Sequence, residues 1–425
     1  MNHELLKNVI FDQREVIKNE KIIERRYELD PKASYVITGL RRAGKSTLLY
    51  KIARDLVNSG ISWNQIIYIN FEDERLIEFS SKDFKDILEV QSELNKNKGY
   101  FFFDEIQNID GWEKFARRLA DTKERVWITG SNAQMLSRQI ATTLGGRYFI
   151  KYITPYRFDE YLRAQDISYD EESQLSTKKR GVISTAFDTF YKNGGFPESL
   201  RYISAREYVE SVYQKVLLGD VATRNNVRNI DALRICMKKI AEAVCNEISV
   251  STLHGNLKAL GFSTGKSTLV DYIYMAQDAY LLFDVKNAVT KFVDREGNPK
   301  RYFSDNGLLN LFLVNKNSAL LENEIAVVLQ DAFPKSLHYL KSNKHGIDID
   351  FYIPEQGIAL QVCYDLSESA KPRELSNLVK LAKIDSSTKR FIIVTKEQEE
   401  TCMQDGVEIE VIPAWKFLLQ LTQSA

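Results

Sequence analysis

The chain has 425 residues, more than one hydrophobic core usually organises, so we expect two to four domains. Hydrophobic residues make up 44% and charged residues 27%, as in ordinary globular proteins, and no apolar run reaches the about 18 residues that a membrane span needs. The 58 basic residues equal the 58 acidic ones in number, so bulk charge predicts no nucleic-acid partner.

The N-terminal residues carry charges from Glu4 to Glu15, which does not match a secretory signal peptide. The four cysteines lack the paired spacing of a zinc site, and the four histidines form no metal-binding motif. We therefore expect a cytoplasmic protein without disulfides, structural zinc or a membrane partner.

A glycine-rich loop follows an apolar run and precedes a helical pattern. The run 35–38 predicts a buried strand, the loop reads Gly39-Leu-Arg-Arg-Ala-Gly44-Lys45-Ser46-Thr47, and residues 46–58 predict a helix. Glycines let the backbone curl so that its N–H groups face phosphate oxygens, and the helix N-terminus adds a partial positive charge. This arrangement is typical of a loop that holds the phosphates of a nucleotide.

The residue types of this loop suggest individual roles. We expect Lys45 to reach the β- and γ-phosphates and the Ser46 hydroxyl to bind Mg²⁺. The other nucleotide-binding residues of the loop are predicted to be Gly39, Arg42, Ala43, Gly44 and Thr47. A second Gly-Lys-Ser, at 265–267, has one residue fewer between its glycines and follows a helical pattern, so it predicts only the start of a helix.

Four further apolar runs, at 66–70, 100–103, 126–129 and 148–152, predict strands separated by helical patterns such as 113–120. Their hydrophobicity is continuous rather than alternating, as in strands that are covered on both faces. We therefore expect a parallel sheet wrapped by helices, with the ligand at the carboxyl ends of the strands.

Two carboxylates, Asp104 and Glu105, directly follow the run of three phenylalanines in the third predicted strand. We expect Asp104 to hold Mg²⁺ and Glu105 to orient and polarise the attacking water. The alternative is a strand that merely ends in acidic turn residues. The phosphate loop upstream favours the functional interpretation.

Two residues are predicted to act on the γ-phosphate. Asn132 follows the fourth predicted strand and would sense this phosphate and position water, with Thr129 or Ser131 as alternatives. Arg147 precedes the last strand, and it could deliver positive charge to the site of a neighbouring subunit or be an ordinary surface arginine. The first role predicts a homo-oligomer.

Together these segments resemble a large prokaryotic family of ATP-binding proteins. The family joins an AAA+-type ATPase, similar to STAND-like and archaeal ATPases, to a C-terminal region of unassigned function. The resemblance implies ATP rather than GTP and covers nearly the whole chain. The matching segments are 39–47, 68–73, 104–107, 130–132, 146–147, 194–198, 302–308, 321–323 and 411–415.

The middle of the chain is predicted to be helical. Residues 161–229 follow the predicted ATPase core, 1–160, and we interpret them as a helical lid. Residues 230–317 predict three helices and a turn-rich hairpin, an order that resembles a winged helix.

The third of these helices, 263–277, is poor in basic residues, so docking of DNA and docking of a protein remain alternatives. Basic residues gather nearby at Arg224, Arg228, Arg234, Lys238, Lys239, Lys286, Lys291, Lys300 and Arg301.

Residues 318–425 alternate between strand and helix patterns in an order that resembles the restriction-endonuclease-like fold. In that fold a glutamate, an aspartate and a Glu-x-Lys motif bind a divalent metal, and Glu322 and Asp350 could supply the first two. The third strand, however, reads Gln361-Val-Cys363. Glutamine carries no charge and cysteine cannot replace lysine, so we expect an inactive scaffold. A displaced lysine such as Lys344 would keep an active nuclease possible.

The sequence thus predicts an α/β multidomain protein with a P-loop parallel sheet, a helical lid, a winged-helix domain and a restriction-endonuclease-like domain. We expect it to hydrolyse ATP with Mg²⁺ and to couple the nucleotide state to the later domains, with DNA or a protein as client. The alternative is a slow, nucleotide-gated regulatory switch, and a metal-dependent nuclease is the least favoured function. Measuring turnover with and without DNA separates the first two.

Overall fold

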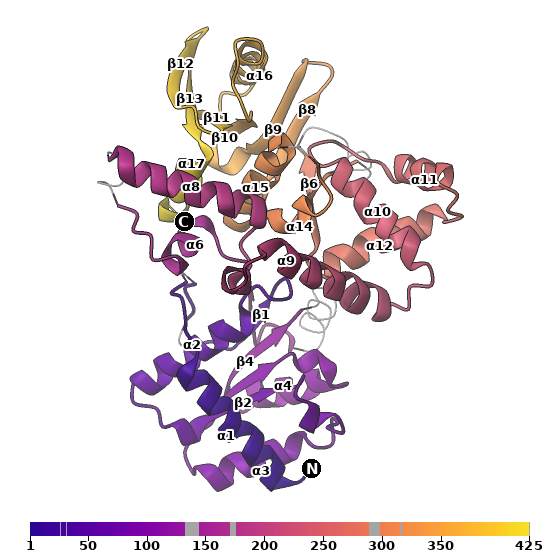
Figure 1. Ribbon diagram of the computed structural model, residues 1–425. Coiled ribbons are helices and arrows are strands. Elements are labelled where there is room, and N and C mark those ends of the chain that lie inside the picture. Colours follow the sequence, from indigo (N-terminus) through magenta and orange to yellow (C-terminus); the bar gives the residue numbers. More distant parts are fainter. Residues whose placement is uncertain are drawn as a thin grey trace. The chain divides into compact units, whose positions relative to one another are not determined.

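The computed structural model describes all residues except 26, 31, 132–143, 171–175, 289–297, 315–316 and 425 (Figure 1). The chain divides into two compact units. The first comprises residues 1–154 with 278–280, and the second comprises 155–277 and 281–425. Each unit contains a β-sheet of its own.

The sheet of the first unit has five strands in the order β2-β3-β4-β1-β5, and all neighbouring pairs are parallel. This confirms the predicted parallel sheet. Phe101, Phe102 and Phe103 are consecutive and each is at most 1% exposed, so both faces of the sheet are covered. The strands are β1 (Tyr35–Thr38), β2 (Ile66–Asn70), β3 (Tyr100–Asp104), β4 (Arg125–Gly130) and β5 (Phe149–Tyr152).

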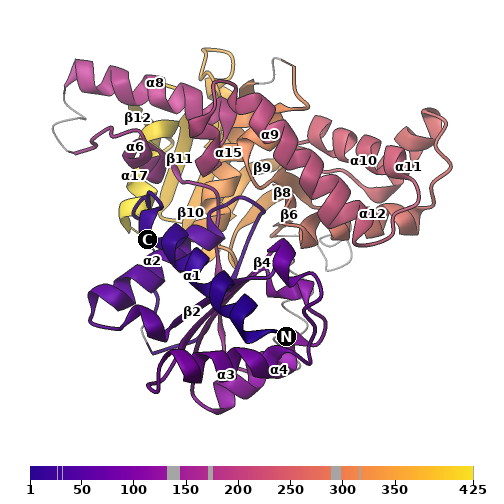
Figure 2. The ribbon, with the colours of Figure 1, turned by 60° about the horizontal axis from the view of Figure 1, so that its bottom comes forward.

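Helices surround this sheet (Figure 2). They are α1 (His3–Asn19), α2 (Lys45–Asn58), α3 (Phe84–Leu94) and α4 (Trp112–Asp121). We had not predicted α1, although Leu6, Val9, Ile10 and Ile17 recur at helical spacing and are fully buried. Short 3₁₀ turns lie at Trp63–Gln65, Glu74–Leu76 and Ile106–Asn108.

The second unit contains an eight-stranded mixed sheet in the order β12-β13-β11-β10-β9-β8-β6-β7. Its strands are β6 (Leu282–Asn287), β7 (Lys300–Phe303), β8 (His338–Ser342), β9 (Ile347–Ile353), β10 (Ile358–Val362), β11 (Arg390–Thr395), β12 (Glu400–Gln404) and β13 (Val407–Pro413). The consecutive residues Ala359 and Leu360 are both fully buried, so helices cover both faces at β10.

Helix α16 packs against β9, β10 and β13, whereas α15 and α17 pack against β7, β10, β11 and β13. The helices of this unit are α6 (Phe158–Ala164), α8 (Thr177–Asn193), α9 (Ala205–Gln214), a π-helical segment (Lys215–Thr223), α10 (Ile230–Glu242), α11 (Val250–Ala259), α12 (Lys266–Asp278), α14 (Asn306–Asn310), α15 (Asn317–Ala332), α16 (Lys371–Ile384) and α17 (Ala414–Ser424). Further 3₁₀ turns lie at Pro197–Arg201 and Pro354–Gln356. No helix in the described part of the chain is long and apolar enough to cross a membrane.

The structure differs from the predicted division in two places. The predicted wing hairpin corresponds to β6 and β7, but β6 also pairs in parallel with β8, so the hairpin continues the large sheet across the expected boundary at 317. The predicted lid helix α8 buries Phe187 and Phe190 and packs against α14, α15 and α17 of the second unit. The strand that pairs with β6 and the helices that contact α8 are all distant in sequence, and periodicity does not reveal such pairings. The winged-helix interpretation is therefore not confirmed.

Candidate functional site

The glycine-rich loop between β1 and α2 curls through several positive φ angles. Gly39, Arg42 and Gly44 have φ values of 144°, 65° and 95°, and α2 begins at the next residue, Lys45. A Cβ atom on Gly39 would lie 2.1 Å from the carbonyl oxygen of Ile153. Only glycine fits this position without a shift of the backbone. The loop therefore leads directly into the N-terminus of α2, as a phosphate cradle requires.

A buried arginine stabilises this loop through hydrogen bonds to backbone carbonyl groups. The side chain of Arg25 is buried, and its guanidinium donates hydrogen bonds of 2.9 Å to the carbonyl oxygens of Ala43 and Thr154. These bonds tie the loop to the segment that follows β5. No pattern in the sequence marks this role of Arg25, because the two backbone oxygens that it binds are 18 and 129 residues away.

The two halves of the predicted site meet at the carboxyl edge of the sheet. Lys45 Nζ lies 4.0 Å from Glu105 Oε1, and both side chains are largely buried. The ammonium also donates hydrogen bonds of 3.1 Å to the carbonyl oxygens of Gly39 and Leu40. The end of β3 thus lies beside the phosphate loop, although β4 separates β3 from β1 in the sheet.

Asp104, the last residue of β3, is held by hydroxyl groups from two neighbouring strands. Tyr68 donates a 2.7 Å hydrogen bond to Oδ2, and Thr129 donates one to Oδ1. The Thr129 oxygen in turn accepts a 3.0 Å bond from the backbone N–H of Glu105. Thr129 was one alternative for the phosphate sensor, whereas Tyr68 had no predicted role. Since β2 and β4 are the two neighbours of β3 in the sheet, their side chains reach Asp104 from both sides.

Glu105 adopts a left-handed backbone conformation with φ of 51°, uncommon for a residue other than glycine. Its Oε2 accepts hydrogen bonds from the Gln107 amide and from the Ser131 hydroxyl, the latter 3.3 Å long. Burial raises the pKa of the Glu105 carboxyl, and the nearby Lys45 charge opposes this effect. Ser131, the other sensor alternative, therefore contacts the predicted water-polarising residue.

The remaining predicted residues differ in position. Ser46 and Thr47 lie partly buried in the first turn of α2, and Arg42 is exposed. Asn132 lies outside the described residues, so its sensor role stays a prediction. Arg147 Nε donates a 2.6 Å hydrogen bond to Asp121.

Arg147 lies just before β5, whose first residue pairs with the first residue of β1, whereas the phosphate loop follows the last. At about 3.3 Å per residue, the strand separates them by roughly 13 Å. The structure therefore gives Arg147 no contact with the loop of its own chain, and a role across subunits stays a prediction.

Comparisons with known proteins agree with this geometry. The model of an AAA domain matches residues 31–162, which include both the phosphate loop and Asp104-Glu105. The uncharacterized protein MJ1544 of Methanocaldococcus jannaschii is 32% identical over 98% of this chain and 95% of its own length. The chain belongs to the family of MJ1544. An uncharacterized protein of Haemophilus influenzae is 28% identical over 89% of this chain and 93% of its own length.

Other comparisons concern the remainder of the chain and its fold. The model of a domain of unknown function, DUF8612, matches residues 184–319. Among solved structures, the Walker-type ATPase PABY2304 of Pyrococcus abyssi aligns with 72% of this chain and 95% of its own, at 14% identity and a TM-score of 0.42. The Orc1 protein of Aeropyrum pernix in complex with DNA aligns with 77% and 93%, at 13% identity and a TM-score of 0.28.

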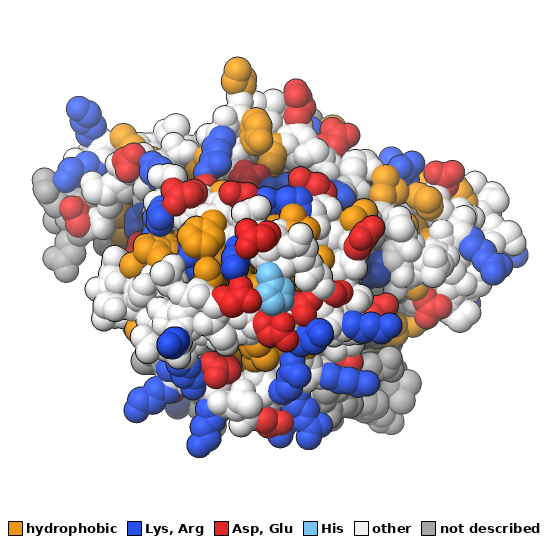
Figure 3. Space-filling view, turned by 90° about the horizontal axis from the view of Figure 1, so that it is seen from below, with side chains coloured by type: hydrophobic (Ala, Val, Ile, Leu, Met, Phe, Trp, Pro, Cys, Tyr) orange, Lys and Arg blue, Asp and Glu red, His pale blue; other side chains and the backbone are white. Residues whose placement is uncertain are grey.

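Basic and acidic side chains are mixed on one face of the molecule. On the face seen in Figure 3, Lys and Arg side chains are interspersed with Asp and Glu. Of the basic residues that could have faced DNA, Lys300 and Arg301 are buried, and Arg224 pairs with Asp220 at 3.4 Å. Lys291 lies outside the described residues. A DNA partner therefore stays a prediction without support from these side chains.

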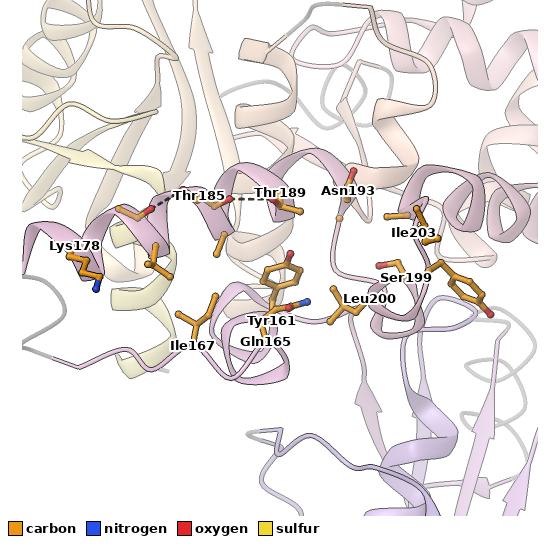
Figure 4. A pocket seen from close by; sticks show the side chains of 16 residues that line it. Tyr161, Gln165, Ile167, Lys178, Thr185, Thr189, Asn193, Ser199, Leu200 and Ile203 are labelled. Carbon is orange, nitrogen blue, oxygen red and sulfur yellow. Dashed lines mark hydrogen bonds between the residues drawn. The ribbon is translucent and has the colours of Figure 1, made fainter.

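The second unit has a pocket of its own, of about 780 Å³, beside α6 and α8 (Figure 4). The Thr185 and Thr189 hydroxyls in its wall already donate to backbone oxygens of the same helix, at 2.9 and 3.2 Å. Tyr202 and Ile203 also line the pocket and are exposed. Gln165, Lys178 and Asn193 add polar groups to its wall, and none of the predicted site residues lines it.

The predicted acids of the second unit also come together. Glu322 on α15 and Asp350 on β9 both bond to the ammonium of Lys300, at 3.2 and 3.1 Å. Gln361 is buried beside them and accepts a 2.8 Å hydrogen bond from the backbone N–H of Asp350. Lys344, the candidate for a displaced lysine, is exposed in the turn between β8 and β9. The lysine that contacts these acids is Lys300, which the sequence places only among the basic residues near the predicted winged helix.

Proposed function

We propose that the first unit binds ATP with Mg²⁺ and hydrolyses it. The observation that carries the proposal is the 4.0 Å approach of Lys45 Nζ to Glu105 Oε1. It places the cation that would neutralise phosphate charge beside the carboxylate that would polarise water. The match of an AAA domain to residues 31–162 supports the proposal.

The oxygen donors near the loop suit a magnesium ion. Ser46 would offer its hydroxyl and Asp104 its carboxylate, and Mg²⁺ prefers such oxygen ligands. Each Asp104 oxygen accepts a hydrogen bond from one hydroxyl group, and a carboxylate oxygen has lone pairs for a second partner. When bound, the ion would neutralise phosphate charge and fix the orientation of the β- and γ-phosphates. The positions of Tyr68 and Thr129 keep the Asp104 carboxylate in one orientation.

Glu105 would act as the residue that orients and polarises water. Its left-handed backbone turns the side chain at the strand end, and the bonds from Gln107 and Ser131 fix one carboxylate oxygen. The other oxygen, Oε1, faces Lys45. Strained backbone at such a position is common where geometry must be fixed. The backbone N–H groups of the loop and Lys45 would hold the triphosphate in line with this carboxylate.

One observation favours the alternative of a slow, nucleotide-gated switch. Gln107 already binds Glu105 Oε2, and the Lys45 ammonium binds two carbonyl oxygens of its own loop. Rearrangement of these bonds would precede efficient turnover, and the state that contains ATP would then be long-lived. In both versions the second unit would carry the binding surface for a client, either DNA or a protein.

Steady-state ATP hydrolysis and retention of ATP, measured together, test the proposal. The wild-type chain should hydrolyse ATP, and Glu105→Gln should retain ATP while turnover falls by about 10²- to 10⁴-fold. Tight retention with undetectable wild-type turnover would favour the switch. Stimulation by duplex DNA would identify a client, and failure to bind ATP at all would overturn both versions.

A further inference from the structure

The ammonium of Lys300 in the second unit lies between two carboxylates from different elements. Its Nζ donates to Glu322 Oε1 of α15 at 3.2 Å and to Asp350 Oδ1 of β9 at 3.1 Å. The Tyr339 ring lies beside the same nitrogen, with its centre at 5.7 Å. Lys300 and Glu322 are buried, and Asp350 is partly buried. The cluster therefore consists of one ammonium and two carboxylates, and it is mostly shielded from water.

Other hydrogen bonds occupy further positions on both carboxylates. The Tyr302 hydroxyl donates a 2.7 Å bond to Glu322 Oε1, the oxygen that also binds Lys300. The backbone N–H of Val362 donates a 3.0 Å bond to Asp350 Oδ2. In both cases the carboxylate accepts from a donor fixed on a strand of the same sheet. The acids are thus held in place without a metal.

The third position of the cluster carries no charge. The Gln361 side chain accepts from the backbone of Asp350 and donates a 3.0 Å bond to Glu374 Oε2 on α16. The thiol of Cys363 donates to the carbonyl oxygen of Asp365, so it serves a local turn. Neither residue directs a charged ligand at the acids.

We infer that the ammonium of Lys300 takes the place of a divalent cation between Glu322 and Asp350, so that this pair of acids is a metal-independent structural site. Lys300 contributes one positive charge where Mg²⁺ or Mn²⁺ would contribute two. The neutral Gln361 fits this difference, because a third carboxylate beside a single ammonium would be left without compensation. A divalent cation added to the cluster would also be repelled by the ammonium.

The position of Lys300 gives this ion pair a structural role. Its backbone pairs with Val285 of β6 and forms an isolated bridge with Glu247, which follows α10. The side chain then joins this strand to α15 and β9. The cluster therefore holds the edge strand β7 against α15 and β9. Through the bridge to Glu247 it also holds the segment after α10, without requiring a bound ion.

Binding of Mn²⁺ to the full chain, followed by its electron paramagnetic resonance signal, tests the inference. All variants carry Asp104→Asn, which removes the carboxylate that could hold Mn²⁺ in the first unit. Only binding that Asp350→Asn abolishes is counted. The Asp104→Asn parent should show no such binding. Lys300→Met, which removes the ammonium, should gain one Mn²⁺ site, and Asp350→Asn should remove it again. Lys344→Met, a change of an exposed lysine, should gain none.

Two results would overturn the inference. One is Mn²⁺ binding to the parent that disappears with Asp350→Asn, because the acids would then be a metal site in the native chain. The other is a folded Lys300→Met variant, judged by circular dichroism, that gains no site. If Lys300→Met does not fold, the Asp104→Asn parent alone tests the inference. Its unfolding temperature should be unchanged by Mn²⁺, and a rise that Asp350→Asn abolishes would contradict the inference.

Discussion

The Gln107 amide donates a hydrogen bond to the Glu105 carboxylate, two residues away across the turn that ends β3. The same oxygen accepts a weaker bond from Ser131, while the other oxygen faces Lys45. Gln107 is itself buried, so the amide is fixed in place. Gln107 thus determines where the carboxylate points, and its effect on catalysis should act through Glu105.

Replacement of Gln107 by alanine should therefore change turnover more than ATP binding. If the amide orients Glu105 for attack, kcat should fall by about 10-fold, which corresponds to about 1.4 kcal/mol, with little change in KM. A rise in kcat would instead show that the bond restrains the enzyme, as the switch version of the proposal requires. Steady-state kinetics distinguish the two, and Gln107→Glu, which repels the carboxylate, should lose more activity than Gln107→Ala.

Gly39→Ala should destabilise the first unit and weaken ATP binding. The added Cβ would lie 2.1 Å from the Ile153 carbonyl oxygen in a backbone with φ of 144°. Strain of this kind costs about 1–3 kcal/mol, and the shift needed to relieve it would distort the phosphate loop. Gly60→Ala is the matched control, because its φ is 104° but nothing lies within 4 Å of the new atom. Equal losses of ATP affinity in the two variants would contradict the role of the close approach.

Much of the first unit could be predicted from the sequence because its signals are local. Each buried strand is a short apolar run, and the spacing from Gly39 to Lys45 fixes both the loop and the start of α2. The meeting of Lys45 with Glu105 follows from parallel strands that end at one edge. The bonds of Arg25 to the distant carbonyl oxygens of Ala43 and Thr154 could not be predicted in this way.

The second unit was harder to predict because its key relationships join distant segments. The sequence groups Lys300 only with the basic residues near the predicted winged helix, since its position carries no sign of Glu322 or Asp350, 22 and 50 residues away. The sequence shows that Gln361 stands where a Glu-x-Lys motif would have its glutamate. It does not show that Lys300 contacts the two acids. Similarly, the parallel pairing of β6 with β8 joins residues about 50 positions apart, which local periodicity does not encode.

Mixing two inactive variants should show whether Arg147 acts across subunits. Arg147 precedes β5, at the edge of the sheet opposite the phosphate loop. A contribution to catalysis therefore requires a neighbouring copy of the chain. Arg147→Ala and Glu105→Gln should each be inactive, and a mixture should regain activity where an intact Glu105 faces an intact Arg147. The rate of the wild type should then rise more steeply than in proportion to protein concentration. Full activity of Arg147→Ala alone would assign the arginine to its bond with Asp121.

The stability of the second unit should fall as the pH rises, because Glu324 is buried on α15. Burial, and secondarily the negative charge of Asp305, raises the pKa of Glu324 to about 8. In the unfolded chain the carboxyl ionises near its ordinary value of about 4.3. The folded state therefore holds the proton more tightly, and this contribution is complete below pH about 4, decreases between these values, and is lost above pH 8.

Glu324→Gln should remove this part of the pH dependence, because the amide stays neutral at every pH. The free energy of unfolding at pH 9 should then exceed that of the wild type by an amount on the order of a few kcal/mol, whereas at pH 4 the two should be similar. Denaturant unfolding at a series of pH values measures both. Glu355→Gln, a change at an exposed glutamate, is the control and should follow the wild type. A Glu324→Gln curve parallel to that of the wild type would show that Glu324 is ionised in the folded protein, with its charge compensated there.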